Sequence, residues 1–223
     1  MKRALAMTAV TVLTAATGLA LAAAGPAAHA SAKAPIRSYT ESSGISLKGV
    51  GSKKGYFSGS GGSERVVLSP HLTFSATSYI QRGSTRQSAQ VVLVGDDYYV
   101  KEGDGSWKKQ VYSAAYLADA AQGLNPYNEE QQFGKLPRVR HASATESTVT
   151  GTIAQIDPFI NDEYGVTVAN FKGTGITTLT ATLSLDSSGR PVKVVVTGHS
   201  SDFDFSVVET FGSFNKPLTI TAP

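Results

Sequence analysis

The chain contains no cysteine in its 223 residues. Disulfide bonds, thiolate metal sites and cysteine nucleophiles are therefore excluded, and so is a lipid anchor attached through a cysteine. Stability must come from a hydrophobic core and from backbone hydrogen bonds between strands. A domain of this length can bury enough surface to fold without covalent cross-links.

Histidine is scarce, and the motifs of common enzyme classes are absent. Beyond residue 30 the histidines are His71, His141 and His199, each without the close pairing that zinc sites use. No G-x-S-x-G elbow, P-loop or G-x-G-x-x-G run occurs. His71 and His199 could meet beside Asp202 or Asp204 and a serine, but serine is so abundant that this coincidence carries little information. We interpret the histidines as exposed strand residues.

Carboxylates that are close in sequence form two pairs, Asp96 with Asp97 and Asp202 with Asp204. Paired carboxylates can bind calcium or perform acid–base work. Aspartates in hairpin turns more often serve the backbone geometry of the turn, and we interpret both pairs in that way. We therefore expect no enzyme activity, no catalytic residue, no metal and no cofactor.

The first 30 residues have the pattern of a secretory signal peptide. Lys2 and Arg3 precede an uncharged apolar stretch over residues 4–24, Gly25-Pro26 interrupts it, and small residues flank a cleavage point after Ala30. The alternative is an uncleaved anchor, because the stretch nearly reaches the ~20 residues that span a bilayer. We expect cleavage, a secreted or extracytoplasmic location, and no transmembrane segment in the mature protein.

The positive net charge of the chain comes mainly from this leader. Removing Lys2 and Arg3 from the 20 basic residues leaves 18 against 17 acidic residues. Nucleic-acid binding requires a basic surface that neutralises phosphates, and no basic stripe accumulates in the remaining sequence. We expect no nucleic-acid partner.

The mature chain is expected to form one domain. Residues 31–43 are polar and show no hydrophobic periodicity, which predicts a flexible leader. Residues 44–223 have a length that is common for a single β-rich domain. The Gly/Ser-rich run at 58–63 resembles a linker, but it lies too near the N-terminus to separate two domains. We interpret it as a mobile hairpin loop.

Period-two alternation predicts strands through most of this domain. In residues 177–185, Leu179, Ala181, Leu183 and Leu185 alternate with polar residues, so one face of that strand should be buried. Trp107 follows a Gly-Asp-Gly turn and should be at least half buried. Further strands are predicted at 66–76, 90–94, 98–101, 148–153, 192–197, 202–211 and 218–221.

Helical spacing replaces this pattern in the middle of the domain. Tyr112, Tyr116, Leu117, Ala120 and Leu124 predict a helix that ends at Gly123 to Pro126, and a second short helix is predicted over 129–133. A meander of strands, a helical insertion and a second meander predict an α+β fold. Its twisted antiparallel sheet would carry the helices on one face.

Three segments together resemble a known family. They are the strand–turn–strand of residues 91–107 (VVLVGDDYYVKEGDGSW), the turn of residues 186–193 (DSSGRPVK) and the C-terminal residues 209–223 (ETFGSFNKPLTITAP). Their order resembles the LolA/LppX-like half-barrel superfamily of bacterial envelope lipoprotein carriers, over most of residues 60–223. The lipid-anchored relatives have a lipobox cysteine, which this chain lacks.

The resemblance implies a curved antiparallel sheet, an open half-barrel, whose concave face is covered by helices over an apolar cavity. It also implies a protein of the cell envelope that binds or carries lipid or another hydrophobic molecule. The expected contact residues are the apolar positions of the long strands and of the helix: Leu72, Phe74, Val92, Val94, Tyr116, Leu117, Leu179, Ala181, Leu183, Val194, Phe203 and Phe205.

A second hypothesis remains open from the sequence. The interior could be packed solid, and the protein would then be a non-catalytic structural or protein-interaction domain of the cell envelope. Its contacts would be made by edge strands or by the 58–63 segment. The expected partner is a hydrophobic small molecule under the first hypothesis and an envelope protein under the second, and we expect a monomer under both.

Overall fold

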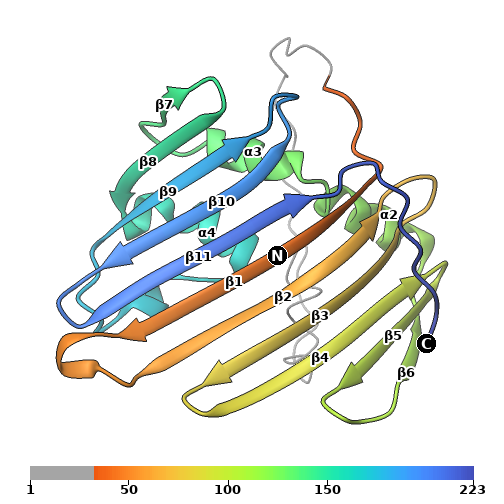
Figure 1. Cartoon of the computed structure of the whole chain (residues 1–223), viewed down its shortest axis with the longest axis horizontal. Helices are drawn as coiled ribbons and strands as arrows, with labels where there is room; N and C mark the ends of the chain where they lie inside the picture. Colours follow the sequence, from red (N-terminus) through yellow and green to blue (C-terminus); the bar gives the residue numbers. More distant parts are fainter. Residues whose placement is uncertain (1–32) are drawn as a thin grey trace.

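One curved antiparallel sheet of eleven strands dominates the structure, a computed structural model that describes residues 33–223 (Figure 1). The predicted signal peptide and its cleavage point lie outside the described residues. The strand order is β6-β5-β4-β3-β2-β1-β11-β10-β9-β8-β7. The first and last strands along the chain, β1 and β11, therefore pair with each other at the centre of the sheet. The strands are β1 (Ser38–Gly49), β2 (Phe57–Val67), β3 (Thr73–Arg82), β4 (Thr85–Val94), β5 (Asp97–Glu102), β6 (Lys108–Val111), β7 (Arg140–Ser143), β8 (Glu146–Thr152), β9 (Thr178–Leu185), β10 (Pro191–His199) and β11 (Phe203–Gly212).

The predicted alternation in β9 is confirmed. Leu179, Ala181 and Leu183 are at most 3% exposed, while the threonines between them lie on the other face. Because directly paired residues of antiparallel strands point to the same side, this assigns one face to every neighbouring strand. We call the face that carries these three side chains the inner face and the opposite one the outer face.

The Gly/Ser-rich run at 58–63 lies inside β2, so its prediction as a mobile loop is wrong. It pairs with β1 on one side and β3 on the other, near the centre of the sheet. A Cβ on Gly62 would stand 2.5 Å from the carbonyl oxygen of Thr77, which requires the absence of a side chain there. Glycine in a strand marks close backbone approach as often as flexibility.

The prediction of a flexible leader up to residue 43 is also wrong for its last part. β1 begins at Ser38 and pairs with β2 and β11 along its length. Before β1, the side chain of Asn215 accepts a hydrogen bond from the backbone N–H of Arg37 over 2.7 Å and donates one to the carbonyl of Pro35 over 3.2 Å. The C-terminal segment therefore holds the residues that lead into the sheet.

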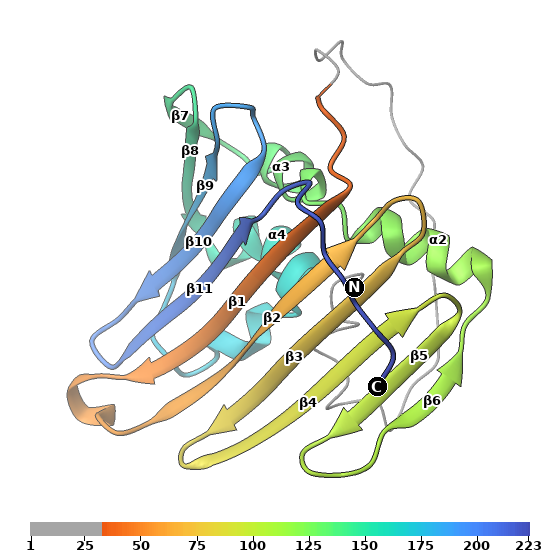
Figure 2. The ribbon, with the colours of Figure 1, turned by 45° about the vertical axis from the view of Figure 1, so that its right-hand side comes forward.

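Three α-helices lie on the same side of the sheet, α2 (Ala114–Gly123), α3 (Tyr127–Gly134) and α4 (Ile153–Tyr164), seen in Figure 2. The first two were predicted. Helix α4 was not predicted, because Pro158 lies inside it and it follows strand β8 directly. A capping box of Thr152 and Gln155 begins α4, and Gly165 ends it with a φ of 65°. Two short 3-10 turns, η2 (Gly51–Lys53) and η3 (Val168–Phe171), complete the described elements.

The buried hydrophobic side chains in residues 33–223 form two clusters rather than one. The first joins α3, α4 and η3 to the inner face of β8–β11, with Phe159 packing edge-on against Phe133 at 5.7 Å. The second joins α2 to the inner face of β1–β5 around Tyr39, Val66 and Leu93. All three helices lie on the inner face, but α3 and α4 contact the half of the sheet that contains β8–β11, and α2 contacts the half that contains β1–β5. That helices cover the whole concave face therefore stays a prediction. Within the described residues, no helix is both long and apolar enough to cross a membrane.

Candidate functional site

A groove of about 480 Å³ opens between α2 and the loops at one end of the sheet. Leu117, Ala118 and Ala121 of α2 form one wall, and Leu68 and Leu72 of the β2–β3 connection form part of the other. The groove is therefore lined largely by apolar side chains, the usual character of a site for a hydrophobic ligand. Two predicted contact residues, Leu72 and Leu117, meet here. For Tyr116, also predicted, the side chain lies outside the described residues.

The phenol of Tyr112 borders the same cluster just before α2. Its ring packs edge-on against Tyr98 with centroids 5.1 Å apart. Burial raises the pKa of Tyr112 above its ordinary value, as expected for a phenol against an apolar wall. The hydroxyl of Tyr112 donates a hydrogen bond to Oε1 of Gln110 over 3.2 Å at the surface, so the ring is partly buried and its polar end is not.

A second groove, of about 300 Å³, opens between the end of α4 and the inner face of β1–β3. Ile45, Ile80 and Phe205 belong to its floor, and Tyr164 and Phe171 belong to its wall. The rings of Phe171 and Phe205 stand edge-on with centroids 4.8 Å apart. The predicted contact residue Phe205 therefore lies in a groove.

Phe203, another predicted contact residue, lies two residues before Phe205 on the same face of β11. It is partly buried against the first cluster and packs edge-on against Tyr56 at 5.6 Å. It lies beside this groove rather than among the residues that line it.

Between the two clusters the inner face becomes polar. Glu209 of β11 pairs with Ser43 of β1, and on the next rung Glu41 of β1 pairs with Glu64 of β2. Glu41 is 7% exposed and Glu209 is 1% exposed. The hydroxyl of Tyr164 donates a hydrogen bond to Glu209 Oε2 over 2.8 Å, so the wall of the second groove contacts this polar strip.

The strip was not predicted, because only carboxylates that are neighbours in sequence were paired. Glu41 and Glu64 come together through the pairing of β1 with β2, and Glu209 joins them through the pairing of β11 with β1. Glutamates at positions that alternate in phase with buried apolar residues, such as Glu209 between Val207 and Phe211, are the signal that could have identified them.

Four of the predicted contact residues belong to the solid part of the core instead of a groove. Leu179, Ala181, Leu183 and Val194 are at most 3% exposed within the first cluster, beneath α4. Phe74 is similarly buried in the second cluster, against Tyr98. These side chains shape the sheet behind the grooves but do not line them.

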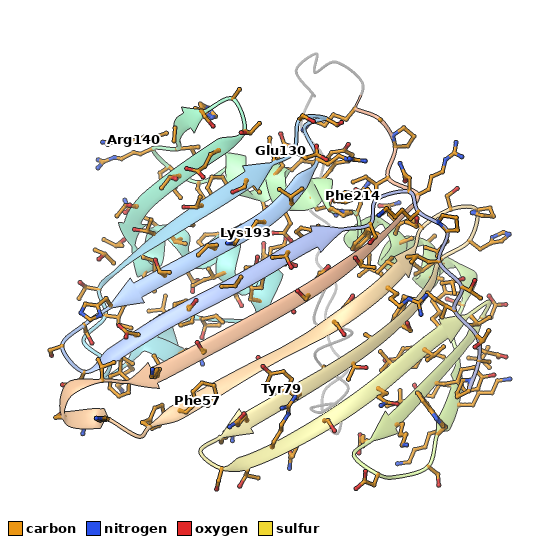
Figure 3. The ribbon with its side chains drawn as sticks, viewed as in Figure 1. Phe57, Tyr79, Glu130, Arg140, Lys193 and Phe214 are labelled. Atoms are coloured by element: carbon orange, nitrogen blue, oxygen red, sulfur yellow. The ribbon has the colours of Figure 1, made fainter. Side chains whose placement is uncertain are left out.

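Val92 and Val94 lie on the outer face, so their placement on the concave face is wrong. Their neighbours Val91 and Leu93 are the buried ones, at 1% exposure each, opposite Ala76 and Phe74. The run 91–94 is apolar at every position, so alternation cannot tell which valines face inward. Tyr79 and Lys193, labelled in Figure 3, lie on the same outer face as Val92.

Trp107 also lies against the outer face, where it lines a shallow pocket of about 250 Å³ with Val92 and Gln90. It is partly buried, which confirms the predicted burial of this side chain.

One predicted histidine and one predicted carboxylate come together in the structure, because His71 and Asp96 both line the α2 groove. His199, in contrast, lies at the β10–β11 turn, where its Nδ1 contacts the carboxylate of Asp204 at the surface. His71 and His199 are at opposite ends of β1, as the pairings of Ser38 with Val67 and of Gly49 with Phe203 show. No cluster of His, Asp and Glu suited to a metal ion occurs among residues 33–223.

Comparison with known proteins gives no family assignment. No family model matches the sequence, and no curated protein matches it. Similar solved structures include LprF from Mycobacterium bovis, 14% identical over 84% of this chain and 90% of that chain, with a TM-score of 0.42. A DUF1329 family protein from Desulfovibrio piger is 9% identical over 82% and 88%, with a TM-score of 0.27.

A third similar structure is a β-barrel-like protein of domain of unknown function DUF1849 from Brucella abortus. It is 10% identical over 81% of this chain and 98% of that chain, with a TM-score of 0.20. At these values the similarities assign neither a family nor a function. The resemblance to the LolA/LppX-like superfamily therefore stays a prediction from the sequence.

Proposed function

We propose that this protein binds and carries a lipid or another hydrophobic molecule outside the cytoplasm, on the inner face of its curved sheet. The observation that carries the proposal is the division of the core into two clusters, each with a groove beside it. A domain with a solid interior usually has one contiguous core. The α2 groove offers apolar surface that the helices leave accessible, and the second groove combines apolar side chains with Arg82 and Asn170.

Binding of this kind needs no chemical step. Each Å² of apolar surface removed from water contributes roughly 25 cal/mol, so a ligand chain laid along either groove gains affinity from area and shape. We therefore propose a non-catalytic role, in which the side chains around Leu117 and Phe205 position the ligand without reacting with it.

The competing hypothesis, a solid interaction domain, has one observation in its favour. The inner face of β8–β10 is fully packed beneath α4, with Ala181 at 0% exposure. Enlarging Ala181 would therefore overpack the core instead of narrowing a ligand site. A variant that tests the carrier proposal must therefore change a residue that lines one of the grooves.

The test uses Ala118, an exposed residue of α2 that lines the larger groove. Ala118→Trp should fill the groove and raise the Kd for the neutral fluorescent probe N-phenyl-1-naphthylamine by about tenfold or more. Ala115→Trp is the matched control, because Ala115 is exposed on the same helix but does not line the groove. It should bind the probe like the unmodified protein.

Melting temperatures of both variants, measured alongside, should stay close to that of the unmodified protein. If the unmodified protein binds no apolar probe, the carrier proposal is wrong. Equal probe binding by the Ala118 and Ala115 variants would remove the α2 groove from the proposal.

A further inference from the structure

A continuous row of polar side chains crosses neighbouring strands on the outer face. Ser63 of β2 pairs with Thr77 of β3, which in turn pairs with Gln90 of β4, and the pairing continues in both directions along the sheet. From β10 to β5 the members are Lys193, Thr210, Ser42, Ser63, Thr77, Gln90 and Lys101. We call these residues the outer row. At about 4.8 Å between neighbouring strands, the row is ~29 Å long.

The outer row is open to solvent and rich in hydrogen-bonding groups. In Figure 1 the outer face is toward the viewer, and α2, α3 and α4 lie behind the sheet. The side chains in the middle of the row are exposed hydroxyls and an amide, which both donate and accept hydrogen bonds. The lysines at its two ends, Lys193 and Lys101, donate and carry positive charge. The row therefore suits a long polar ligand that has hydroxyls and negative charge.

The shallow outer-face pocket of about 250 Å³ lies on this row. Ser63, Thr77 and Gln90 line it together with Val92 and the indole of Trp107. An indole offers a flat apolar surface with one N–H donor at its edge, and here hydroxyls and an amide lie around it. A sugar ring has the complementary shape, with apolar C–H groups on its face and hydroxyls around its edge. The pocket therefore suits one sugar unit of a chain that continues along the row.

Positive charge collects on the same half of the outer face. The cationic side chains that the register of β1–β6 places there are Lys48, Arg65, Arg86, Lys101 and Lys109. Asp97 is the one carboxylate among the outward-facing residues of these six described strands, and its Oδ2 contacts Lys109 Nζ at 2.8 Å. Basic and acidic residues nearly balance beyond residue 30, so folding gathers a charge that composition does not show. A face of this kind attracts anions.

One of these cations is held in place by an aromatic ring. The guanidinium carbon of Arg86 lies 3.9 Å from the centroid of the Tyr79 ring. Tyr79 in turn lies against Gly61, where an added Cβ would be 3.0 Å from the tyrosine hydroxyl oxygen. This contact keeps the guanidinium over the rung next to the outer row, and Arg65 lies on the rung on the other side. A stacked guanidinium can still bind a carboxylate through two parallel hydrogen bonds.

We propose that the outer face binds an acidic polysaccharide, which crosses the strands along the outer row with one sugar unit against Trp107. Its hydroxyls exchange hydrogen bonds with Ser63, Thr77 and Gln90, and its carboxylates lie beside the arginines and lysines of this face. The site is independent of the proposed carrier function, because the sheet separates it from both grooves. A single-stranded polynucleotide is also a linear polyanion, but such chains stack their bases on successive aromatic side chains, and the outer row contains none.

The test compares hexagalacturonate, a short linear chain of uronic acids, with its methyl ester, which keeps the sugar units and removes their charges. Calorimetric titration near neutral pH in low salt should give a Kd for hexagalacturonate at least about tenfold below that for the ester. Added salt should raise the Kd for the acid and leave that for the ester unchanged. Equal Kd values would overturn the acidic assignment, and failure of hexagalacturonate to bind would overturn the site.

Two lysine variants with the same change of charge locate the site. Lys101→Gln removes a cation from the outer row and should raise the Kd for hexagalacturonate by about threefold or more. Lys108→Gln is the matched control, because Lys108 is exposed on the next strand and its pairing with Val100 places it on the inner face. It should leave the Kd almost unchanged, and equal effects of the two variants would overturn the placement on the outer row. Trp107→Leu should weaken binding of the acid and the ester alike.

Two further measurements separate this site from other possibilities. Hexathymidylate should bind more weakly than hexagalacturonate, and tighter binding would overturn the polysaccharide in favour of a nucleic acid. Saturating hexagalacturonate should leave the binding of N-phenyl-1-naphthylamine unchanged, because the two ligands are expected on opposite faces of the sheet. Displacement of that probe would put the saccharide in a groove and overturn the outer-face assignment. These measurements use the unmodified protein, so they decide the question even where a variant fails to fold.

Discussion

The hydroxyl of Tyr164 donates a hydrogen bond to Oε2 of Glu209 over 2.8 Å, and both residues are almost fully buried. Tyr164 is the last residue of α4, and Glu209 lies on the inner face of β11. This contact joins the helix end to the centre of the sheet, beside the carboxylates of the polar strip and at the edge of the second groove.

Removing this hydroxyl should destabilise the fold measurably. Tyr164→Phe deprives a buried carboxylate of a donor, and we expect the free energy of unfolding to fall by about 1–3 kcal/mol. Tyr56→Phe, at a ring that is 49% exposed, should change it by less than about 0.5 kcal/mol. Urea denaturation of the two variants measures the difference, and equal effects would show that the contact does not hold α4.

The two faces of β9 should respond oppositely to a charge. Leu183 is 3% exposed, and Leu183→Asp should cost about 3–5 kcal/mol because it buries an unpaired carboxylate. Thr182 lies on the outer face beside Thr148, and Thr182→Asp should cost less than about 1 kcal/mol. Similar melting temperatures for these variants would contradict the register of β9.

The β9–β10 turn should contribute stability that disappears in acid. Burial alone would raise the pKa of Asp186, but hydrogen bonds from Arg190 outweigh it, and the net pKa lies below its ordinary value. One is from the Arg190 backbone N–H to Oδ1 over 2.9 Å, and another from Nε to Oδ2 over 2.7 Å. Because the folded state favours the ionised carboxylate, its contribution is present above the unfolded pKa of about 3.9 and is lost as pH falls through the lower folded pKa.

The variant Asp186→Asn should therefore be less stable than the unmodified protein at pH 7, by about 0.5–1 kcal/mol. Chemical denaturation at a series of pH values should show this gap closing as the pH falls below the ordinary aspartate pKa of about 3.9. A gap of the same size at neutral pH and in strong acid would mean that the charge of Asp186 contributes nothing.

The C-terminal segment should control protection of the residues before β1. Asn215 adopts a φ of 58°, and its side chain contacts both Arg37 and Pro35. Asn215→Gly tolerates this φ but removes the side-chain contacts, so the amide of Arg37 should exchange with deuterium faster. Lys216→Ala serves as the control and should leave that amide protected. Unchanged exchange in the Asn215 variant would show that other contacts hold the segment.

The sequence predicts the strands better than it predicts which of their faces is buried. β9 was assigned correctly because its apolar residues alternate strictly with threonines, whereas β4 contains four apolar residues in succession and gives no such signal. Pairing of Leu93 with Tyr98 and Phe74, which no local pattern reveals, decides the orientation of β4. The glycines and serines at 58–63 have a composition typical of a linker, which predicted a loop. In the structure they belong to β2, where small residues allow close packing against β1 and β3.

The candidate site was the least predictable part. Leu72, Leu117 and Phe205 were identified from apolar alternation and helical spacing, and the structure places them at or in the grooves. In the polar strip, Glu209 joins Glu41 only because β11 pairs with β1. These two residues lie near opposite ends of the described chain, so spacing alone gives no reason to group them.

The pairing of β1 with β11 has a consequence for how the molecule is made. Ser42 and Thr210 contact each other through their hydroxyls at 2.8 Å although they are 168 residues apart. Every other neighbouring pair in the sheet is consecutive along the chain. The two outer meanders can therefore form as soon as their own hairpins exist, whereas the central seam must wait for the last strand. A nascent chain stopped before residue 203 would present β1 and β10 as two unpaired edges, each a template for another molecule.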